Sequence, residues 1–154
     1  MQTTDESRFY AFGNYYLSSI QQGIQALHVV TEMFTKYEYD STEYKQLHNW
    51  ANKHKTVVLL NGGNAKALKD MYALFNEWVQ EGMTFPFAKF NEDMQSLDGA
   101  LTSTGIVLPA YIYNGAKALR ISENADHVLM TMSKQYLSYE LQLMQLLNQF
   151  DLAH

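Results

Sequence analysis

The segment from residue 19 to residue 37 carries polar side chains at helical spacing, and their types are suited to ligand binding. Four of them share one stripe of the predicted helix: Gln21, Gln25, His28 and Glu32. The neighbouring, mostly apolar stripe consists of Ile20, Ile24, Leu27, Thr31 and Phe34. We expect the apolar stripe to pack on the protein core, which leaves amide and imidazole groups along the other edge. That polar edge is the predicted binding site.

The composition fits one compact domain, because 47% of the 154 residues are apolar and no change in composition divides the chain. The chain contains no cysteine, which excludes disulfide bonds, thiolate metal sites and a cysteine nucleophile. The N-terminal sequence lacks the basic start and apolar run of an export signal, and no stretch is apolar enough for a membrane span. We therefore expect a cytoplasmic protein that does not use a membrane.

The charge balance argues against a large nucleic-acid partner. The chain has 11 Lys and Arg residues against 16 Asp and Glu residues, a net charge of −5. Affinity for a nucleic-acid backbone comes mainly from basic side chains that release counterions, so tRNA is a disfavoured ligand. A small anion needs only a few donors. The five histidines show no metal-binding spacing, and we expect neither a metal site nor a cofactor.

Strand-like and helix-like segments alternate over the first 110 residues, which is typical of an α/β domain. Short β-branched or aromatic runs predict strands at 8–13, 56–60, 85–90 and 105–109. Helical periodicity predicts a first helix from Ser18 or Ser19 to about residue 37, where Ser19 and Gln22 have the spacing of a capping box. A short helix follows Ser41 or Thr42, and a longer one ends near residue 81.

The pattern becomes purely helical after residue 109. One long helix is predicted over 122–150, with a four-three apolar repeat at Met132, Tyr136, Tyr139, Leu143, Leu146 and Phe150. A second apolar stripe consists of Met130, Leu137, Leu141 and Met144. Two stripes are more than one sheet can cover, so we interpret one of them as an oligomer contact; a fully buried helix is the alternative. The single domain 1–154 then has a core at 8–112 and a helical oligomerisation extension at 113–154.

The order of these elements and a few residues resemble the type 2 peptidyl-tRNA hydrolases over residues 8–112. The family's first helix carries a pattern like GKxAAQxSHA, and SIQQGIQALHV places Gln25 and His28 at its Gln and His. In the family an Asp-Ala-Gly turn precedes a Thr-Val-Leu-x-x-x-Pro run, and NEDMQSLDGALTSTGIVLP has nearly the same length. The resemblance implies a four-stranded mixed sheet flanked by helices, here followed by the long C-terminal helix.

The resemblance also implies a set of catalytic residues, which this sequence matches only in part. The family's Asp and Thr correspond either to Asp93, with no clear Thr partner, or to Asp98 with Thr102 after a shifted gap. A hydrolase would use His28 with these residues, and Thr104 is the alternative to Thr102. Ester hydrolysis needs a base for the attacking water and donors for the developing oxyanion, so His28 alone is insufficient. A purely structural histidine is the competing interpretation.

The family's catalytic lysine is missing, because Ser19 and Ile20 stand where the Gly-Lys pair is expected. An acidic, tyrosine-rich fold of this kind is similar to phage-encoded proteins that act as oligomeric sponges for the cyclic nucleotide signals of antiphage defence such as CBASS. That resemblance implies a non-catalytic nucleotide-binding protein, in the host cytoplasm if phage-encoded, that forms a homo-oligomer such as a dimer or tetramer. Peptidyl-tRNA hydrolase activity is the alternative.

A bound nucleotide would have a mixed set of contacts. The predicted ligand-binding residues are Tyr15, Tyr16, Ser18, Gln21, Gln25, His28, Lys55, Lys89 and Arg120. The two tyrosines would stack on a base, since aromatic stacking contributes about 1–3 kcal/mol per base. The amide and imidazole groups would read the edge of the base, and the lysine and arginine side chains would contact its phosphate.

Overall fold

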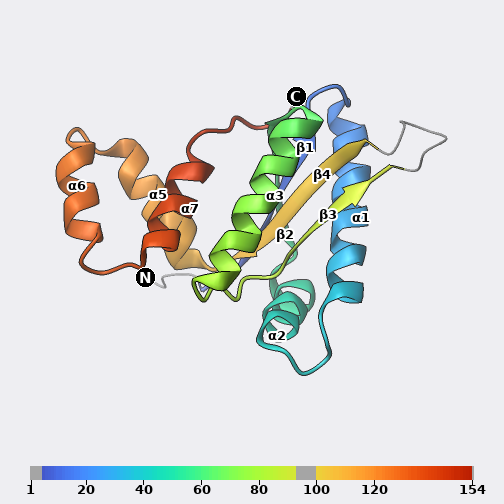
Figure 1. Cartoon of the computed structure of the whole chain (residues 1–154), viewed down its shortest axis with the longest axis horizontal. Coiled ribbons are helices and arrows are strands. Elements are labelled where there is room, and N and C mark those ends of the chain that lie inside the picture. Colours follow the sequence, from blue (N-terminus) through green and yellow to red (C-terminus); the bar gives the residue numbers. More distant parts are fainter. Residues whose placement is uncertain (1–4, 93–99, 154) are drawn as a thin grey trace.

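The computed structural model describes residues 5–92 and 100–153, so Asp93 and Asp98 lie outside the described residues. It shows an α/β arrangement in which a four-stranded mixed sheet lies between helices (Figure 1). The predicted fold class is confirmed at this level. The described helices include none that combines the length and apolar character needed to cross a membrane.

The sheet is built from strands that are distant in sequence. They are β1 (Arg8–Asn14), β2 (Thr56–Gly63), β3 (Phe87–Asn91) and β4 (Leu101–Leu108), in the order β2-β1-β4-β3. β1 and β2 are parallel, whereas β4 is antiparallel to both β1 and β3. β4 begins at Leu101 and not at the predicted residue 105. Its polar residues 102–104 look like a loop in the sequence, but all three are buried in the sheet.

One face of the sheet is covered by α1 (Ser19–Lys36) and α2 (Thr42–Asn49), which continues into the π-helical segment η1 (Trp50–His54). The core on this face is a cluster of buried residues that includes Phe9, Val29, Met33, Leu47 and Trp50. The Trp50 ring meets the Phe9 ring edge-on at 5.6 Å, and its Nε1 donates to the Thr56 carbonyl at 2.9 Å. These contacts tie α2 and η1 to the start of β2.

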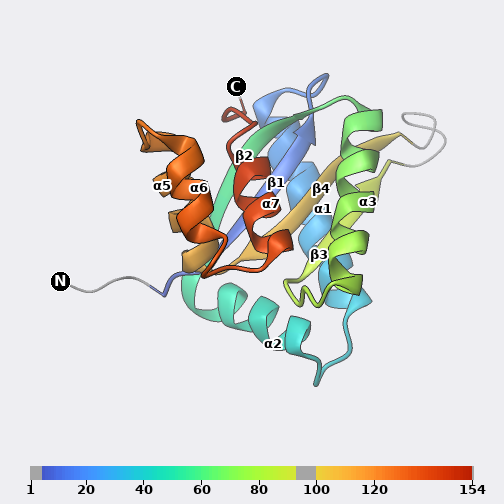
Figure 2. The same cartoon turned by 60° about the vertical axis from the view of Figure 1, so that its left-hand side comes forward.

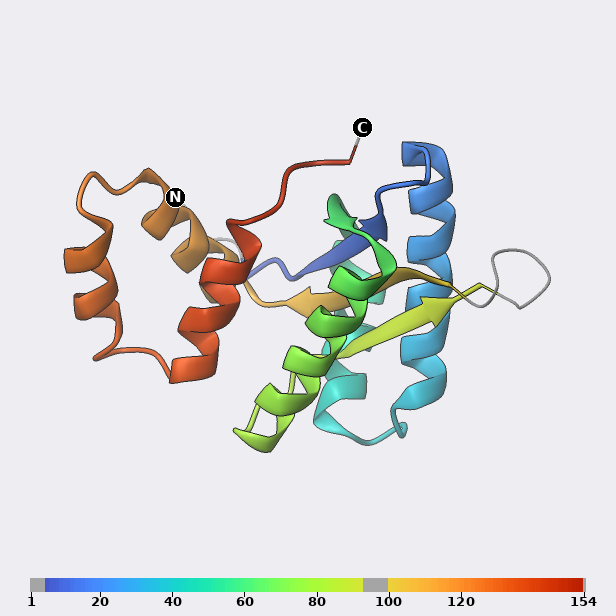
Figure 3. The ribbon, with the colours of Figure 1, turned by 45° about the horizontal axis from the view of Figure 1, so that its top comes forward.

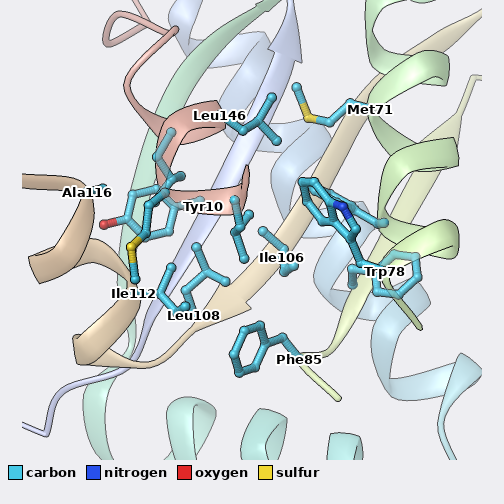
Figure 4. Packing of buried hydrophobic residues seen from close by; sticks show 14 of the residues in the cluster. Tyr10, Met71, Trp78, Phe85, Ile106, Leu108, Ile112, Ala116 and Leu146 are labelled. Atoms are coloured by element: carbon cyan, nitrogen blue, oxygen red, sulfur yellow. The ribbon is translucent and has the colours of Figure 1, made fainter. Parts of the chain in front are cut away.

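The larger core lies on the opposite face. There α3 (Ala65–Gln80) covers the sheet, α5 (Ala110–Ile121) and α7 (Ser138–Leu147) pack beside it, and α6 (Ala125–Met132) lies outermost (Figure 2). Figure 4 shows how the side chains from the sheet and from these helices meet. Tyr10 and Ile106 rise from the sheet, Trp78 comes from α3, and Ile112 and Leu146 come from α5 and α7.

The predicted helix over 122–150 is wrong, because the chain forms two shorter helices there. Backbone hydrogen bonds from residues 133–136 close a turn after α6, and the Glu140 carboxylate accepts from the Leu137 N–H at 2.8 Å to begin α7. Folding back in this way buries residues of both predicted stripes within the chain: Met132, Tyr139, Leu141, Leu143, Met144 and Leu146. The two-stripe argument for an oligomer contact here therefore fails, and self-association stays a prediction.

The segment after α7 returns to the sheet beside β2 (Figure 2). Its Leu152 forms an antiparallel bridge with Leu60. The Asn61 N–H donates to the Asp151 carbonyl at 2.9 Å, and the Ala153 N–H donates to the Leu59 carbonyl at 3.0 Å. This pairing protects part of the outer edge of β2, which would otherwise present unpaired backbone groups.

Candidate functional site

Two of the predicted ligand-binding residues form the start of α1. Ser18 is the N-cap, so the expected capping box at Ser19 and Gln22 is wrong by one position. The Gln21 N–H donates to the Ser18 Oγ at 3.2 Å, and the Ser18 N–H donates to the Gln21 Oε1 at 2.9 Å. Both side chains are thus used to satisfy backbone groups at the helix end.

The faces of α1 are not arranged as its sequence predicts. The apolar residues Ile20, Ile24 and Leu27 are 77%, 52% and 65% exposed, so the expected packing of this stripe is wrong. Five other residues of α1 are buried: Gln22, Gln25, Ala26, Val29 and Met33. The reason lies in the sheet below, where two glycines allow close approach. A Cβ atom at Gly13 would lie 2.3 Å from the Gln22 Oε1, and one at Gly105 would lie 3.1 Å from a Val29 methyl carbon.

Gln25 connects α1 to the sheet. The Thr102 hydroxyl donates to the Gln25 Oε1 at 3.2 Å, and the Gln25 Nε2 donates to the Glu92 Oε2 at 3.1 Å. Gln25 is only 9% exposed and Thr102 only 1%. Burial of an amide requires such partners, so this side chain holds α1 against β4 and the end of β3. It is enclosed and does not offer a free edge to a ligand.

His28 lies one turn further along α1 and is exposed. Its ring stacks on the Phe90 ring of β3, with centroids 4.4 Å apart and planes 16° from parallel. Within the described ranges no group hydrogen-bonds to the imidazole. The residue is exposed, so a ligand can reach the imidazole beside the Phe90 ring.

A hollow of about 400 Å³ lies next to this stacked pair, at the outer edge of β3. We call it the lysine hollow; its lining residues are Glu32, Lys36, Tyr72, Ala88, Lys89, Phe90 and Asn91. Glu32 and Lys36 continue the polar stripe of α1, and this helix lies next to β3 (Figure 3). A recess therefore exists along the predicted polar edge, at its C-terminal half. Sequence reasoning missed Lys36, although it follows Glu32 at the same four-residue spacing.

Both ammonium groups at the lysine hollow lie near the ring of Tyr72, one of its lining residues; the Lys36 Nζ is 5.4 Å from that ring's centroid. The Lys36 Nζ lies 3.6 Å from the centroid of the Phe87 ring and donates to the Phe87 carbonyl at 3.0 Å. Burial lowers the pKa of Lys36 from 10.5 to about 8, and the nearby Glu43 carboxylate opposes this shift. The Lys89 Nζ lies 4.9 Å from the Tyr72 ring centroid, and the Lys36 Nζ also donates to the Tyr72 hydroxyl at 3.4 Å. Neither lysine forms an ion pair with a carboxylate whose position is described.

The other predicted contacts lie elsewhere. Tyr15 and Tyr16 stack on each other at 4.2 Å beyond the end of β1, and both are exposed. Lys55 precedes β2, whose first residue pairs with Arg8, so it lies at the opposite end of β1 from the tyrosines. Arg120 belongs to α5, on the other face of the sheet from α1. The structure therefore places Gln25, His28 and Lys89 around β3 and does not gather all of the predicted residues at one site.

The residues implied by hydrolase chemistry are enclosed or outside the described residues. The Thr102 hydroxyl is occupied by Gln25, and the buried Thr104 hydroxyl donates to the Leu68 carbonyl at 3.3 Å. Asp93 and Asp98 fall in the part of the chain without described positions. Among the described residues, His28 is thus the exposed member of that set.

Comparison of the sequence with protein-family models and with curated proteins finds no match. The described residues place an exposed imidazole, two ammonium groups and one carboxylate around the lysine hollow. Such a set can hold an anion and stack a ring. Among the described residues, this set includes no base that is paired with oxyanion donors.

Proposed function

We propose that the protein binds a small anionic nucleotide in the lysine hollow without breaking it. The observation that carries this proposal is the pair of ammonium groups, Lys36 and Lys89, on the Tyr72 and Phe87 rings beside the exposed His28–Phe90 stack. The volume of about 400 Å³ lies within the range typical of small-molecule sites.

Each chemical part of a nucleotide has a partner at this edge. The ammonium groups attract phosphate, and the partial burial of Lys36 strengthens that attraction because solvent screens it less. The exposed imidazole of His28 stacks on a base, a contact with a typical magnitude of about 1–3 kcal/mol. Glu32 can accept a hydrogen bond from an exocyclic amine or a ribose hydroxyl.

Binding without turnover is supported by the state of the polar residues under α1. Gln25 and Thr102 hydrogen-bond to each other and are nearly inaccessible. A hydroxyl in this position cannot donate to a substrate oxyanion without opening the contact between α1 and β4. The missing family lysine has no replacement at position 20, where Ile20 is exposed.

The finer assignment that we propose is a divergent type 2 peptidyl-tRNA hydrolase-like fold that sequesters cyclic oligonucleotides in the cytoplasm. The mixed sheet flanked by helices and the position of Gln25 and His28 on the first helix support this resemblance. We also propose that the protein self-associates, and that the contact is the exposed apolar face of α1 and not the C-terminal helices. That face presents three exposed apolar side chains at helical spacing, Ile20, Ile24 and Leu27, and contiguous exposed apolar surface is typical of interaction sites.

The test is a thermal-shift and equilibrium-binding series with cyclic dinucleotides, cyclic trinucleotides and, separately, peptidyl-tRNA. A ligand at a hundred times its Kd stabilises a protein by about 2.7 kcal/mol, which gives a clear melting shift. Lys36→Met with Lys89→Ala, and separately His28→Ala, should weaken binding at least tenfold. Lys66→Ala is the matched control, because it removes an exposed lysine of α3.

Recovery of the intact nucleotide after incubation supports the binding function. Release of the peptide from peptidyl-tRNA, abolished by His28→Ala, would establish the hydrolase instead. If the variant with Lys36→Met and Lys89→Ala binds the nucleotide as tightly as the wild type, the lysine hollow is not the binding site.

A further inference from the structure

A second hollow of about 380 Å³ lies at the opposite edge of the sheet, and two arginines line it. Arg8 comes from β1 and Arg120 from α5, while Asn148 and Leu152 come from α7's end and the segment that follows. We call it the arginine hollow. It borders β2, whereas the lysine hollow borders β3, and the order β2-β1-β4-β3 places these strands at the two outer edges.

The polar groups around the arginine hollow have unused hydrogen-bonding capacity. The Arg8 Nε and the Asn148 Oδ1 are buried, and neither has a hydrogen-bond partner in the described part of the chain. A buried donor and a buried acceptor without partners are rare in folded proteins, and each such group calls for an explanation. A ligand that supplies an acceptor to Arg8 and a donor to Asn148 provides one.

The Arg8 side chain is held in place before any ligand binds. Its guanidinium carbon lies 4.0 Å above the centre of the Tyr113 ring, and the Tyr113 hydroxyl donates to the Glu6 carbonyl. The Asn148 Nδ2 donates to the Ala116 carbonyl at 2.9 Å, which fixes the direction of its Oδ1. Preorganised groups lose little conformational entropy on binding, so this arrangement favours recognition over a merely solvated surface.

Tyr10, another lining residue of the arginine hollow, lies near both arginines. Burial raises the pKa of Tyr10, and the Arg8 and Arg120 guanidinium groups both act to lower it. Both guanidinium groups therefore contribute positive potential at the Tyr10 hydroxyl. The lining contains one acidic side chain, Asp151, so the positive charges outnumber the negative one.

The walls indicate what the body of the ligand is like. Val58, Leu60, Leu147 and Phe150 form apolar sides around the two arginines. Guanidinium groups match the planar or forked oxygens of carboxylates and phosphates, with which they form paired hydrogen bonds. An inorganic ion would fill the polar end and leave the apolar walls empty.

We propose that the arginine hollow binds a small organic anion whose phosphate or carboxylate contacts Arg8 and Arg120 and whose apolar body packs on Leu147 and Phe150. A hydrogen-bond donor on the same molecule meets the Asn148 Oδ1. This site is separate from the lysine hollow and does not depend on the proposed function.

Binding there also acts on the segment beside β2. Phe150, Asp151 and Leu152 are part of the lining, and two backbone hydrogen bonds hold this segment to β2. A ligand that contacts the segment stabilises its pairing with β2. The amide protons of Asn61 and Ala153, which form those two hydrogen bonds, report on this effect through their exchange rates.

The experiment is an NMR titration of the full chain with four probes: phenyl phosphate, benzoate, inorganic phosphate and the neutral analogue benzyl alcohol. We expect phenyl phosphate or benzoate to shift the Arg8 Nε–H resonance and to slow exchange at Asn61 and Ala153. The stronger of these two probes identifies the anionic group. Inorganic phosphate should bind more weakly, and benzyl alcohol should leave the Arg8 resonance in place.

The variants separate this site from the rest of the surface. Arg120→Gln should weaken the better probe at least tenfold, while Lys117→Gln, which removes an exposed charge from the same helix, should not. Lys89→Ala should leave this binding unchanged, so the proposals for the two hollows can be refuted independently. The proposal is overturned if neither organic anion moves the Arg8 resonance at millimolar concentration, or if Arg120→Gln binds as tightly as Lys117→Gln.

Discussion

The partly buried ammonium of Lys36 makes a specific prediction about pH. We compare the wild type with Lys36→Met, which keeps most of the side-chain length and removes the charge. Burial lowers the pKa of Lys36 in the folded protein to about 8, from 10.5 in a solvated chain. Below pH 8 the lysine is protonated in both states, so the folded state carries the full penalty of a buried charge. Between pH 8 and 10.5 the folded protein releases the proton first, and the penalty disappears.

The expected size follows from the shift. Each pKa unit corresponds to about 1.36 kcal/mol, so the whole shift would correspond to about 3 kcal/mol if the site were closed to solvent. The ammonium borders an open hollow, and screening reduces this to about 1 kcal/mol over pH 7 to 9.5. The wild type should therefore become more stable relative to Lys36→Met by about that amount as the pH rises.

The assay is urea unfolding of both proteins at pH 7, 8, 9 and 9.5, read by tryptophan fluorescence. Burial also raises the pKa of Tyr37 and Tyr72 above the usual value of 10, so both phenols stay protonated in the folded protein over this pH range. Lys45→Met, at an exposed position on α2, is the control and should show no such trend. Parallel stability curves for the wild type and Lys36→Met would refute the reasoning.

Three further predictions concern α1 and the sheet beneath it. Gly105→Ala should destabilise the fold by about 1–3 kcal/mol, because its Cβ would lie 2.4 Å from the Phe9 ring. Gly23→Ala should instead stabilise α1 by about 0.5–1 kcal/mol, because the nearest atom to its Cβ is 3.7 Å away. Chemical unfolding measures both changes, and equal effects on stability would contradict the packing of α1 on the sheet. Ser18→Ala should remove about 1 kcal/mol of stability and Ser19→Ala much less, and the reverse order in thermal melts would show that the cap is misplaced. Leu27→Lys should leave the melting temperature within a few degrees but reduce any oligomer in light scattering; an unchanged assembly would exclude this face as the contact.

The arrangement of the sheet and its first helices follows from local patterns that survive in the fold. The run TVVLL is short and β-branched and does begin β2, and Ser41, one of the two expected caps, is the N-cap of α2. The helix break at 133–137 contains neither Gly nor Pro and so has no local signal. There the energy of burying most of the first apolar stripe together with Leu141 and Met144 of the second outweighs the continuity of the heptad pattern.

The site was predicted less well because polarity was used as a sign of exposure. Gln25 is polar but enclosed, since Thr102 on a distant strand satisfies its amide. Ile24 is apolar but exposed, since the glycines of the sheet draw the opposite face of α1 inward. Partners so far apart along the chain leave no periodic trace in a single sequence. Lys36 could have been found from the sequence, because it continues the four-residue spacing of His28 and Glu32.

The central position of β1 has a consequence for synthesis on the ribosome. β1 (residues 8–14) pairs with β2 (residues 56–63) and with β4 (residues 101–108), so its second neighbour is made long after it. Until β4 is made, the nascent chain exposes Phe9 and Phe12, which are both fully buried in the folded protein. Such a chain is open to chaperone capture and to misassembly during that interval. Slowing translation ahead of residue 101 should therefore lower the yield of native protein more than slowing it afterwards.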